Sequence, residues 1–177
     1  MAGTPVGITP VPAGVGQAFG FLVHDVSRLI KRRFERRARR MGLSITRQQA
    51  AVMLNIAAKE GVSQTEVAAW LGIEPIALVR MLDKLHEEGL VERRAHPTDR
   101  RVRTLWLTAS AGLVVDQILA INEEIRHEAF AALPPETRDA LTDVLGQIKD
   151  NLALREAVAC ERSGDGSSDA AVTGLGT

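Results

Sequence analysis

Apolar residues recur every three or four positions over most of the chain, which is the spacing of one face of an α-helix. Phe19, Val23 and Val26 follow this spacing and predict an amphipathic helix from about residue 16 to residue 40. Similar stripes predict a long helix capped by Thr108 and, after the helix-breaking pair Pro134-Pro135, a last helix. The chain is therefore expected to be mainly helical.

Two start signals open shorter helices in the middle of the chain. Thr46 with Gln49 three residues later is a capping-box pattern, and Ser63 with Glu66 repeats it. The first pattern predicts a helix that runs to about residue 59 and the second predicts a short helix, because the reciprocal side-chain bonds satisfy amides that a helix start leaves free.

Another helix is expected over residues 74–88, directly after a turn that contains Gly72. Pro75 suits the first turn of a helix, and Gly89 suits the residue after its end. Leucines at positions 78, 82 and 85 supply its buried stripe. The period then changes, because residues 90–94 and 103–107 are short strand candidates on either side of a turn sequence.

A short helix, a tight turn, a second helix and a hairpin within so short a stretch are typical of a winged helix-turn-helix. The predicted fold class is mainly α with a small β-hairpin wing (α+β), in which the N- and C-terminal helices form a dimerisation domain. Those terminal helices are too long and too apolar to be satisfied by so small a winged domain, so we expect them to pack against a second copy of the chain. The predicted organisation is a disordered tail (1–14), a dimerisation helix and linker (15–45), the winged domain (46–107), C-terminal dimerisation helices (108–158) and a second disordered tail (159–177).

Composition and charge narrow the functional class. The chain has 177 residues, of which 45% are hydrophobic and 25% charged, as in globular proteins. The single cysteine, Cys160, and a start that does not look like a signal peptide fit a cytoplasmic protein with no membrane association. The net charge of zero conceals an asymmetry: residues 27–103 carry 17 Lys and Arg against 9 Asp and Glu, whereas residues 104–177 carry 5 against 12. An acidic partner such as nucleic acid, or a chance segregation of charge onto solvated faces, would explain it.

Specific residues then point to a family. The stretch Gly72 to Leu85 (GIEPIALVRMLDKL), the run EGLVER at 88–93, Asp99-Arg100-Arg101 and Leu107-Thr108 resemble the MarR (multiple antibiotic resistance regulator) family, nearest its SlyA-like branch. The resemblance covers roughly residues 20–155. It implies a homodimeric winged-helix transcription regulator that binds pseudo-palindromic operators in double-stranded DNA and is released by a small, often aromatic and anionic, ligand.

The helix over 74–88 would read the major groove. In a helix-turn-helix the second helix presents its N-terminal residues to base edges, and Arg80 can contact a guanine with two hydrogen bonds. The alternative for Arg80 is a solvated side chain or a local ion pair with Asp83. The candidate major-groove residues are Pro75, Ile76, Ala77, Arg80, Met81 and Lys84.

The hairpin carries a second group of cations, which could follow the phosphate backbone and enter a narrow minor groove. The family resemblance implies that Asp99 orients Arg101, at the wing tip, through an ion pair. The alternative is a solubilising turn with a surface salt bridge. The candidate wing residues are Arg93, Arg94, Asp99, Arg100, Arg101 and Arg103.

The first helix carries eight Lys and Arg against Glu35 over residues 28–40. Three interpretations stay open: contact with flanking DNA phosphates, a border of an effector pocket that takes phosphorylated ligands such as an acyl-coenzyme A thioester, or pairing with the acidic final helices (Glu123, Glu124, Glu128, Asp139 and Asp143). The candidate effector or phosphate contacts are Arg36, Arg37, Arg39 and Arg40.

No sequence pattern for an enzyme, a cofactor or a metal site is found, and Trp70 and Trp106 are expected in the core of the winged domain. The sequence therefore predicts a homodimeric, sequence-specific DNA-binding regulator, a repressor, with a small-molecule effector. The alternative is a winged-helix module that binds protein without sequence-specific DNA binding.

Overall fold

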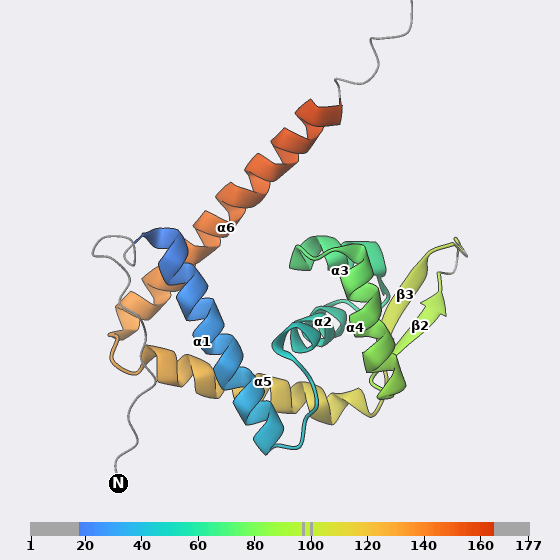
Figure 1. The fold of residues 1–177 in the computed structure, drawn as a ribbon, viewed down its shortest axis with the longest axis horizontal. Coiled ribbons are helices and arrows are strands. Elements are labelled where there is room, and N and C mark those ends of the chain that lie inside the picture. Colours follow the sequence, from blue (N-terminus) through green and yellow to red (C-terminus); the bar gives the residue numbers. More distant parts are fainter. Residues whose placement is uncertain (1–17, 97, 100, 165–177) are drawn as a thin grey trace, which may run out of the picture. The chain divides into compact units, whose positions relative to one another are not determined.

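The computed structural model describes residues 18–96, 98–99 and 101–164, and it describes side chains as far as residue 153. The described residues up to Glu128 form one compact unit, and those from Ala129 onward form a second. The elements, in chain order, are α1 (Phe19–Arg40), α2 (Arg47–Ala58), β1 (Val62–Ser63), α3 (Gln64–Leu71), α4 (Pro75–Glu87), β2 (Val91–Ala95), β3 (Arg103–Leu107), α5 (Ala111–Phe130) and α6 (Pro135–Gly164) (Figure 1). The mainly helical chain with one small sheet agrees with the predicted fold class.

The two predicted capping boxes are present. The Thr46 hydroxyl accepts a hydrogen bond from the Gln49 amide at 3.2 Å, and the Gln49 side chain accepts one from the Thr46 amide at 2.9 Å. Ser63 and Glu66 make the same pair of bonds at the start of α3. Each box satisfies two amides that would otherwise have no partner, which is why α2 and α3 begin at these residues.

A left-handed glycine makes the turn between the two helices of the helix-turn-helix. Gly72 ends α3 with φ at 59°, and the next amide, of Ile73, donates back to the Ala68 carbonyl. Only glycine enters this region of backbone conformation without steric cost. Pro75 then opens α4 at its first position, where a missing N–H costs nothing.

The core of the first unit joins helices that are distant in sequence. Leu78, Leu82 and Leu85 of α4 are fully buried, as the stripe predicts. They belong to one apolar cluster with Phe34 of α1 and Ile121 of α5, so α1 and α5 share a core with the winged part of the chain. Burying a leucine or phenylalanine side chain stabilises the folded state by about 1.5–3 kcal/mol, so this cluster holds α4 firmly in place.

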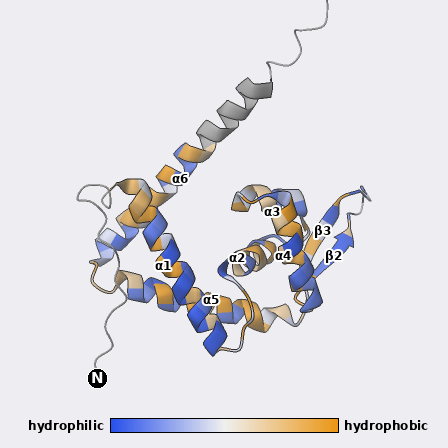
Figure 2. Cartoon of the chain, in the orientation of Figure 1, coloured by the Kyte–Doolittle hydropathy of each residue, from blue (hydrophilic) through white to orange (hydrophobic). Residues whose placement is uncertain are grey.

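The sheet has three antiparallel strands in the order β1-β3-β2. Val91 pairs with Leu107 and Ala95 with Arg103, so β2 and β3 form the predicted hairpin. β3 lies between the other two strands, and its hydrophobic residues are Leu105 and Leu107, while Glu92, Arg93 and Arg94 make the middle of β2 hydrophilic (Figure 2). The strand β1 was not predicted from the sequence, because two residues are too few to show an alternating pattern.

The structure corrects three expectations. Thr108 does not cap α5: its hydroxyl donates to the Gly89 carbonyl at 2.6 Å and closes the base of the wing on the end of α4, and α5 begins three residues later. Trp70 is not a core residue, because half of its surface is exposed. The last helix runs to Gly164, past the expected start of the tail at residue 159. The predicted tail over residues 1–14 lies outside the described residues.

Candidate nucleic-acid interface

The outer face of α4 presents an uninterrupted row of exposed side chains. Ile76, Arg80 and Lys84 are spaced four residues apart and therefore lie on one face of the helix, opposite the buried leucines. Ile76 is 69% exposed, an unusual state for isoleucine. Pro75 and Ala77 are also exposed at the start of the helix. Five of the six predicted major-groove residues are thus accessible to a ligand.

Met81, the sixth, is placed differently. Its side chain is half-buried and packs against the apolar cluster, so it supports α4 and does not share the exposed row. The sequence spacing put Met81 near the edge of the outward face. Neighbouring elements cover that edge, and the pattern within a single helix does not indicate which elements pack beside it.

Arg80 has no partner in the described part of the chain. Its predicted alternative, a local ion pair with Asp83, is not formed because Asp83 is engaged elsewhere: its Oδ1 accepts from Nη1 of Arg93 at 2.6 Å. No carboxylate of the described residues lies within 4.0 Å of the Arg80 guanidinium. A charged fork at the N-terminal half of an exposed helix is well placed to bind an acceptor pair on a ligand.

Arg93 turns toward α4 and away from the outer face of the wing. Besides its ion pair with Asp83, its Nη2 donates to the Val79 carbonyl at 3.3 Å. The cause is the two-residue period of the strand: Arg93 pairs with Leu105 in the sheet and shares its inward face, while Arg94 points to the other side. Arg93 therefore ties the hairpin to α4.

Arg94 lies on the outer face and is held there by two neighbours. Its guanidinium stacks 4.5 Å above the Trp106 ring and donates to Glu92 at 2.7 Å. The hydrogen bond to Glu92 raises the pKa of Arg94, and the same bond lowers the pKa of Glu92. Arg94 is half exposed, so it keeps donors free for a ligand while its position is restricted.

Side chains build the described part of the hairpin tip. The Asp99 carboxylate accepts from the backbone amide of Arg101 at 2.9 Å, and the His96 ring nitrogen Nδ1 accepts from the amide of Thr98 at 3.3 Å. The expected ion pair between the side chains of Asp99 and Arg101 is absent from the described residues, and the carboxylate binds the backbone instead. Arg101 and Arg103 are exposed, while Arg100 lies outside the described residues.

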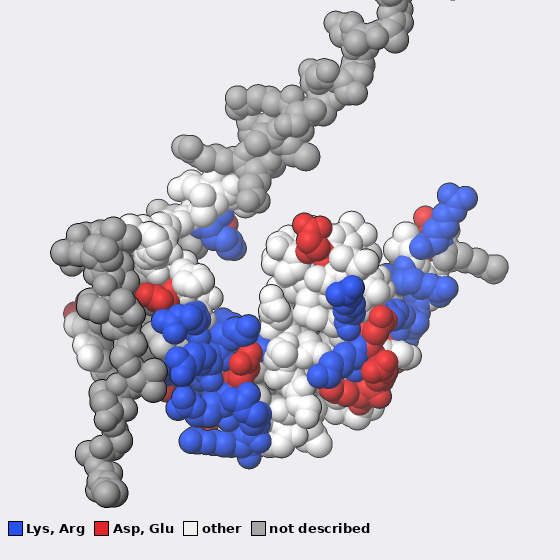
Figure 3. Space-filling view, viewed as in Figure 1, with Lys and Arg blue, Asp and Glu red and all other residues white. Residues whose placement is uncertain are grey.

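Cations and carboxylates lie close together on the surface of the winged part. Figure 3 shows Lys and Arg over the hairpin and α4 next to a group of Asp and Glu, and a second, denser gathering of cations over α1. The exposed cations of α4 and of the hairpin thus lie near one another on the winged part of the chain. The basic face of α1 is a separate surface.

Two of the α1 arginines pair with α5. Arg33 donates to Glu128 at 2.6 Å, and Arg37 donates to Glu124 at 2.9 Å and to Glu128 at 2.7 Å. The hydrogen bonds from Arg33 and Arg37 lower the pKa of Glu128, and the bond to Glu128 raises the pKa of Arg37. The pairing interpretation is therefore confirmed for Arg33 and Arg37, with Glu124 and Glu128 as their partners.

The basic face of α1, including the two paired arginines, borders a cavity. Arg32, Arg33, Arg36, Arg37 and Arg40 line a cavity of about 370 Å³ together with Glu128. We call this surface the arginine hollow. Leu29 completes its lining. Arg39, a predicted effector contact, is exposed and does not line it.

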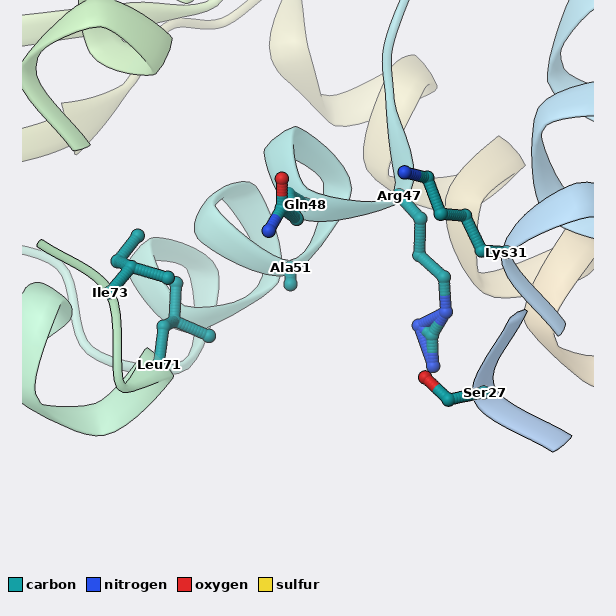
Figure 4. Close-up of a pocket in the computed structure, with 7 residues that line it drawn as sticks. All are labelled: Ser27, Lys31, Arg47, Gln48, Ala51, Leu71 and Ile73. Atoms are coloured by element: carbon teal, nitrogen blue, oxygen red, sulfur yellow. The ribbon is translucent and has the colours of Figure 1, made fainter. Parts of the chain in front are cut away.

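A second cavity, of about 300 Å³, lies where α1, α2 and the turn after α3 meet. Figure 4 shows the Arg47 side chain extending toward Ser27, the Lys31 side chain beside Arg47, and Leu71 and Ile73 across the cavity. We call it the α1–α2 pocket. The sequence did not identify it, because its lining comes from segments that are far apart in the chain.

The described residues contain no group of three or more His, Cys, Asp and Glu side chains arranged to hold a metal ion. Within the same part of the chain, no helix has the length and apolar character needed to cross a membrane.

Comparison with known proteins shows which family and which structures the chain resembles. The sequence model of the MarR family matches residues 43–102, which include α2, α3, α4 and β2 but end just before β3. The transcriptional repressor CouR, solved bound to a 23-mer DNA duplex, is 26% identical, with a TM-score of 0.71, over 80% of this chain and 99% of that one. A mutant of E. coli MarR in complex with operator DNA is 25% identical, with a TM-score of 0.67, over 75% of this chain and 94% of that one.

The transcriptional regulator SlyA has a TM-score of 0.74 over 81% of this chain and 99% of that one, but at 16% identity this likeness concerns the fold alone. The closer affinity to a SlyA-like branch stays a prediction. The sequence match over residues 43–102 and the shared architecture over most of the chain lead to one conclusion: this part of the chain is similar to the MarR family, and the chain has the fold of the MarR transcriptional regulators.

Proposed function

We propose that this protein is a homodimeric, sequence-specific DNA-binding transcription regulator that acts as a repressor. The observation that carries the proposal is the outer face of α4, where Ile76, Arg80 and Lys84 are exposed above a buried leucine stripe. Arg80 has no carboxylate partner in the described part of the chain, so its fork is available to a guanine edge. Two solved structures of the same fold carry DNA.

The wing supplies the backbone contacts in this proposal. Arg94, Arg101 and Arg103 are exposed along the hairpin and can approach phosphates beside the groove that α4 enters. Arg93 acts as a positioning residue, since its bonds to Asp83 and the Val79 carbonyl set the hairpin against α4. Arg100 stays a predicted wing contact.

A second copy of the chain would cover the apolar start of α1. Phe19, Leu22, Val23 and Val26 are spaced as one helical stripe, and each is at least 44% exposed. A stripe of this kind at the surface of a globular unit marks an interface. Two-fold pairing through it would present two α4 helices to a pseudo-palindromic site about one DNA turn, ~34 Å, apart.

The effector is proposed to enter the α1–α2 pocket. Lys31 and Arg47 can hold an anionic group, while Leu71 and Ile73 can contact an apolar ring. A small aromatic anion, or an acyl-coenzyme A thioester, fits that chemistry. The pocket joins α1 to the helix-turn-helix, so a ligand with different affinity for two arrangements of these parts would shift the population toward one of them.

Selection from a random duplex library followed by binding measurements tests the proposal. We expect enrichment of a palindromic sequence, and we expect Arg80→Ala to reduce its binding by about 10- to 100-fold, the loss of one base contact. Arg126→Ala removes a cation from the exposed Glu123 pair on α5 and should bind as the parent does. Failure to enrich any sequence would contradict the proposal and favour a protein-binding module.

A further inference from the structure

The arginine hollow contains more arginines than its neighbouring carboxylates pair with. Arg33 and Arg37 are paired with Glu124 and Glu128. Arg32, Arg36 and Arg40 line the same cavity, and no carboxylate of the described residues comes within 4.0 Å of them. We propose that the arginine hollow binds an oligophosphate, a small molecule with two or more linked phosphate groups.

The spacing of the three unpaired arginines matches a linear polyanion. Residues 32, 36 and 40 are four positions apart, so their Cα atoms advance by about 6 Å along the helix axis at each step. A single carboxylate or phosphate can engage one or two guanidinium groups, but linked phosphates extend along the row. Guanidinium forks bind pairs of phosphate oxygens in a planar geometry that lysine cannot reproduce, and the lining cations are all arginines.

The hollow also has the form of a site. Its volume of about 370 Å³ is concave space between α1 and the end of α5 in the first unit, rather than a flat cationic face. Like charges four residues apart on a helix repel each other. The helix dipole favours cations in the last turn, where Arg37 and Arg40 lie, but not at Arg32, about two turns before Arg40. A bound polyanion would relieve this repulsion.

A ligand in the hollow would also compete with α5 for two of its arginines. Each phosphate group offers oxygens equivalent to those that Glu124 and Glu128 now present to Arg33 and Arg37. Binding would therefore exchange ion pairs between α1 and α5 for contacts with the ligand. This site is separate from the α1–α2 pocket and does not depend on the proposed DNA binding.

Titration calorimetry of the full chain with inorganic tripolyphosphate, in the absence of DNA, tests the proposal. We expect saturable binding by the parent protein and at least a tenfold loss in the double variant Arg36→Gln/Arg40→Gln. The matched control is Arg28→Gln/Arg39→Gln, which removes two exposed cations of the same helix outside the hollow. The control should bind within twofold of the parent. Equal losses in the two double variants, or absence of binding by the parent, would overturn the proposal.

Further measurements distinguish an oligophosphate site from binding of single phosphate groups or of DNA. Inorganic phosphate at the same ionic strength should bind at least tenfold more weakly than tripolyphosphate, and equal affinity would contradict a site for linked phosphates. The variant Arg36→Lys/Arg40→Lys keeps the charge but loses the guanidinium groups. Its affinity for tripolyphosphate should therefore lie between that of the parent and that of the glutamine variant. If Arg36→Gln/Arg40→Gln keeps tripolyphosphate binding and instead lowers affinity for DNA and its salt dependence, the arginines contact DNA and the proposal is wrong. Thermal unfolding of each variant confirms that it is folded.

Discussion

Single side chains in the wing differ in role although their residue types are the same. Arg93 and Arg94 are adjacent arginines, yet one bonds to α4 and the other stacks on Trp106. The strand places neighbours on opposite faces, and only the elements packed on each face decide what an arginine meets. The side of the sheet on which each lies therefore supports the positioning role proposed for Arg93 and the DNA contact proposed for Arg94.

Variants of Arg93 and Asp83 distinguish a positioning role from direct DNA contact. If Arg93 only holds the hairpin against α4, Arg93→Ala and Asp83→Asn should weaken binding to the selected duplex to a similar extent, and the double variant should add little. If Arg93 contacts phosphate, Asp83→Asn would instead strengthen binding, since it removes a negative charge. The change in stability should be small, about 0–1 kcal/mol, because Asp83 is half exposed. Binding by fluorescence anisotropy and unfolding by urea measure the two effects.

Glu66 makes the stability of the α3 start depend on pH. Its hydrogen bond from Lys59, followed by those from Ser63, lowers the pKa of Glu66 from 4.5 to about 2. A lowered folded-state pKa favours the ionised form in the native state, so its stabilising effect is complete above about pH 4.5 and is lost as the pH falls toward 2. Glu66→Gln should flatten the fall in thermal midpoint between these values. The control Glu87→Gln, an exposed carboxylate of α4, should keep the slope of the parent.

Two left-handed glycines, Gly61 and Gly72, form turns beside β1 and after α3. Gly61 precedes β1 with φ at 78°, and its amide donates to the Leu105 carbonyl at 2.9 Å. A Cβ added there would lie 3.1 Å from the Trp106 ring, whereas one added at Gly72 would meet no atom within 4 Å. The two glycines share a backbone conformation but not a packing environment.

Three glycine variants should change stability in an ordered way. Gly72→Ala should destabilise the chain by about 1–2 kcal/mol, the cost of a left-handed residue with a Cβ. Gly61→Ala should cost more, because the ring of Trp106 must also move. Gly112→Ala, in α5 where a Cβ meets no atom within 4 Å, should stabilise by about 0.5–1 kcal/mol. Urea unfolding measures all three, and a Gly61→Ala loss no larger than that of Gly72→Ala would contradict the assigned Trp106 contact.

For the molecule as a whole, the separation of charge along the sequence has two outcomes. Part of the positive charge of α1 is neutralised by the carboxylates of α5, which come from the acidic part of the chain. The cations of α4 and the wing keep an exposed surface (Figure 3). The charge asymmetry in the sequence therefore reflects both an internal ion-pair network and a surface available to an acidic partner.

The exposed stripe of α1 makes the oligomeric state testable. Val26→Asp places a charge in the stripe at a position that is 54% exposed, so each chain should fold while a dimer formed through this face should dissociate. Ile76→Asp makes the same kind of change on α4 and should leave the dimer intact. Sedimentation velocity distinguishes monomer from dimer for each variant. A parent protein that sediments as a monomer would exclude the proposed dimer.

Local signals were sufficient for much of this fold. The two capping boxes, the proline at the start of α4 and the buried leucine stripe predicted their elements because the bonds and periods involved span only a few residues. The outward residues Ile76, Arg80 and Lys84 follow from the same helical period. The resemblance to the MarR family came from this short, dense stretch.

Other features depend on contacts between residues that are distant in the chain. The partner of Arg93, the bonding of Thr108 to Gly89 and the exposure of Trp70 depend on which elements pack together. The two-residue strand β1 exists because β3 offers it hydrogen bonds, and both cavities form where separate segments meet. A sequence pattern states what each residue prefers, whereas its neighbours across space determine which of those preferences is satisfied.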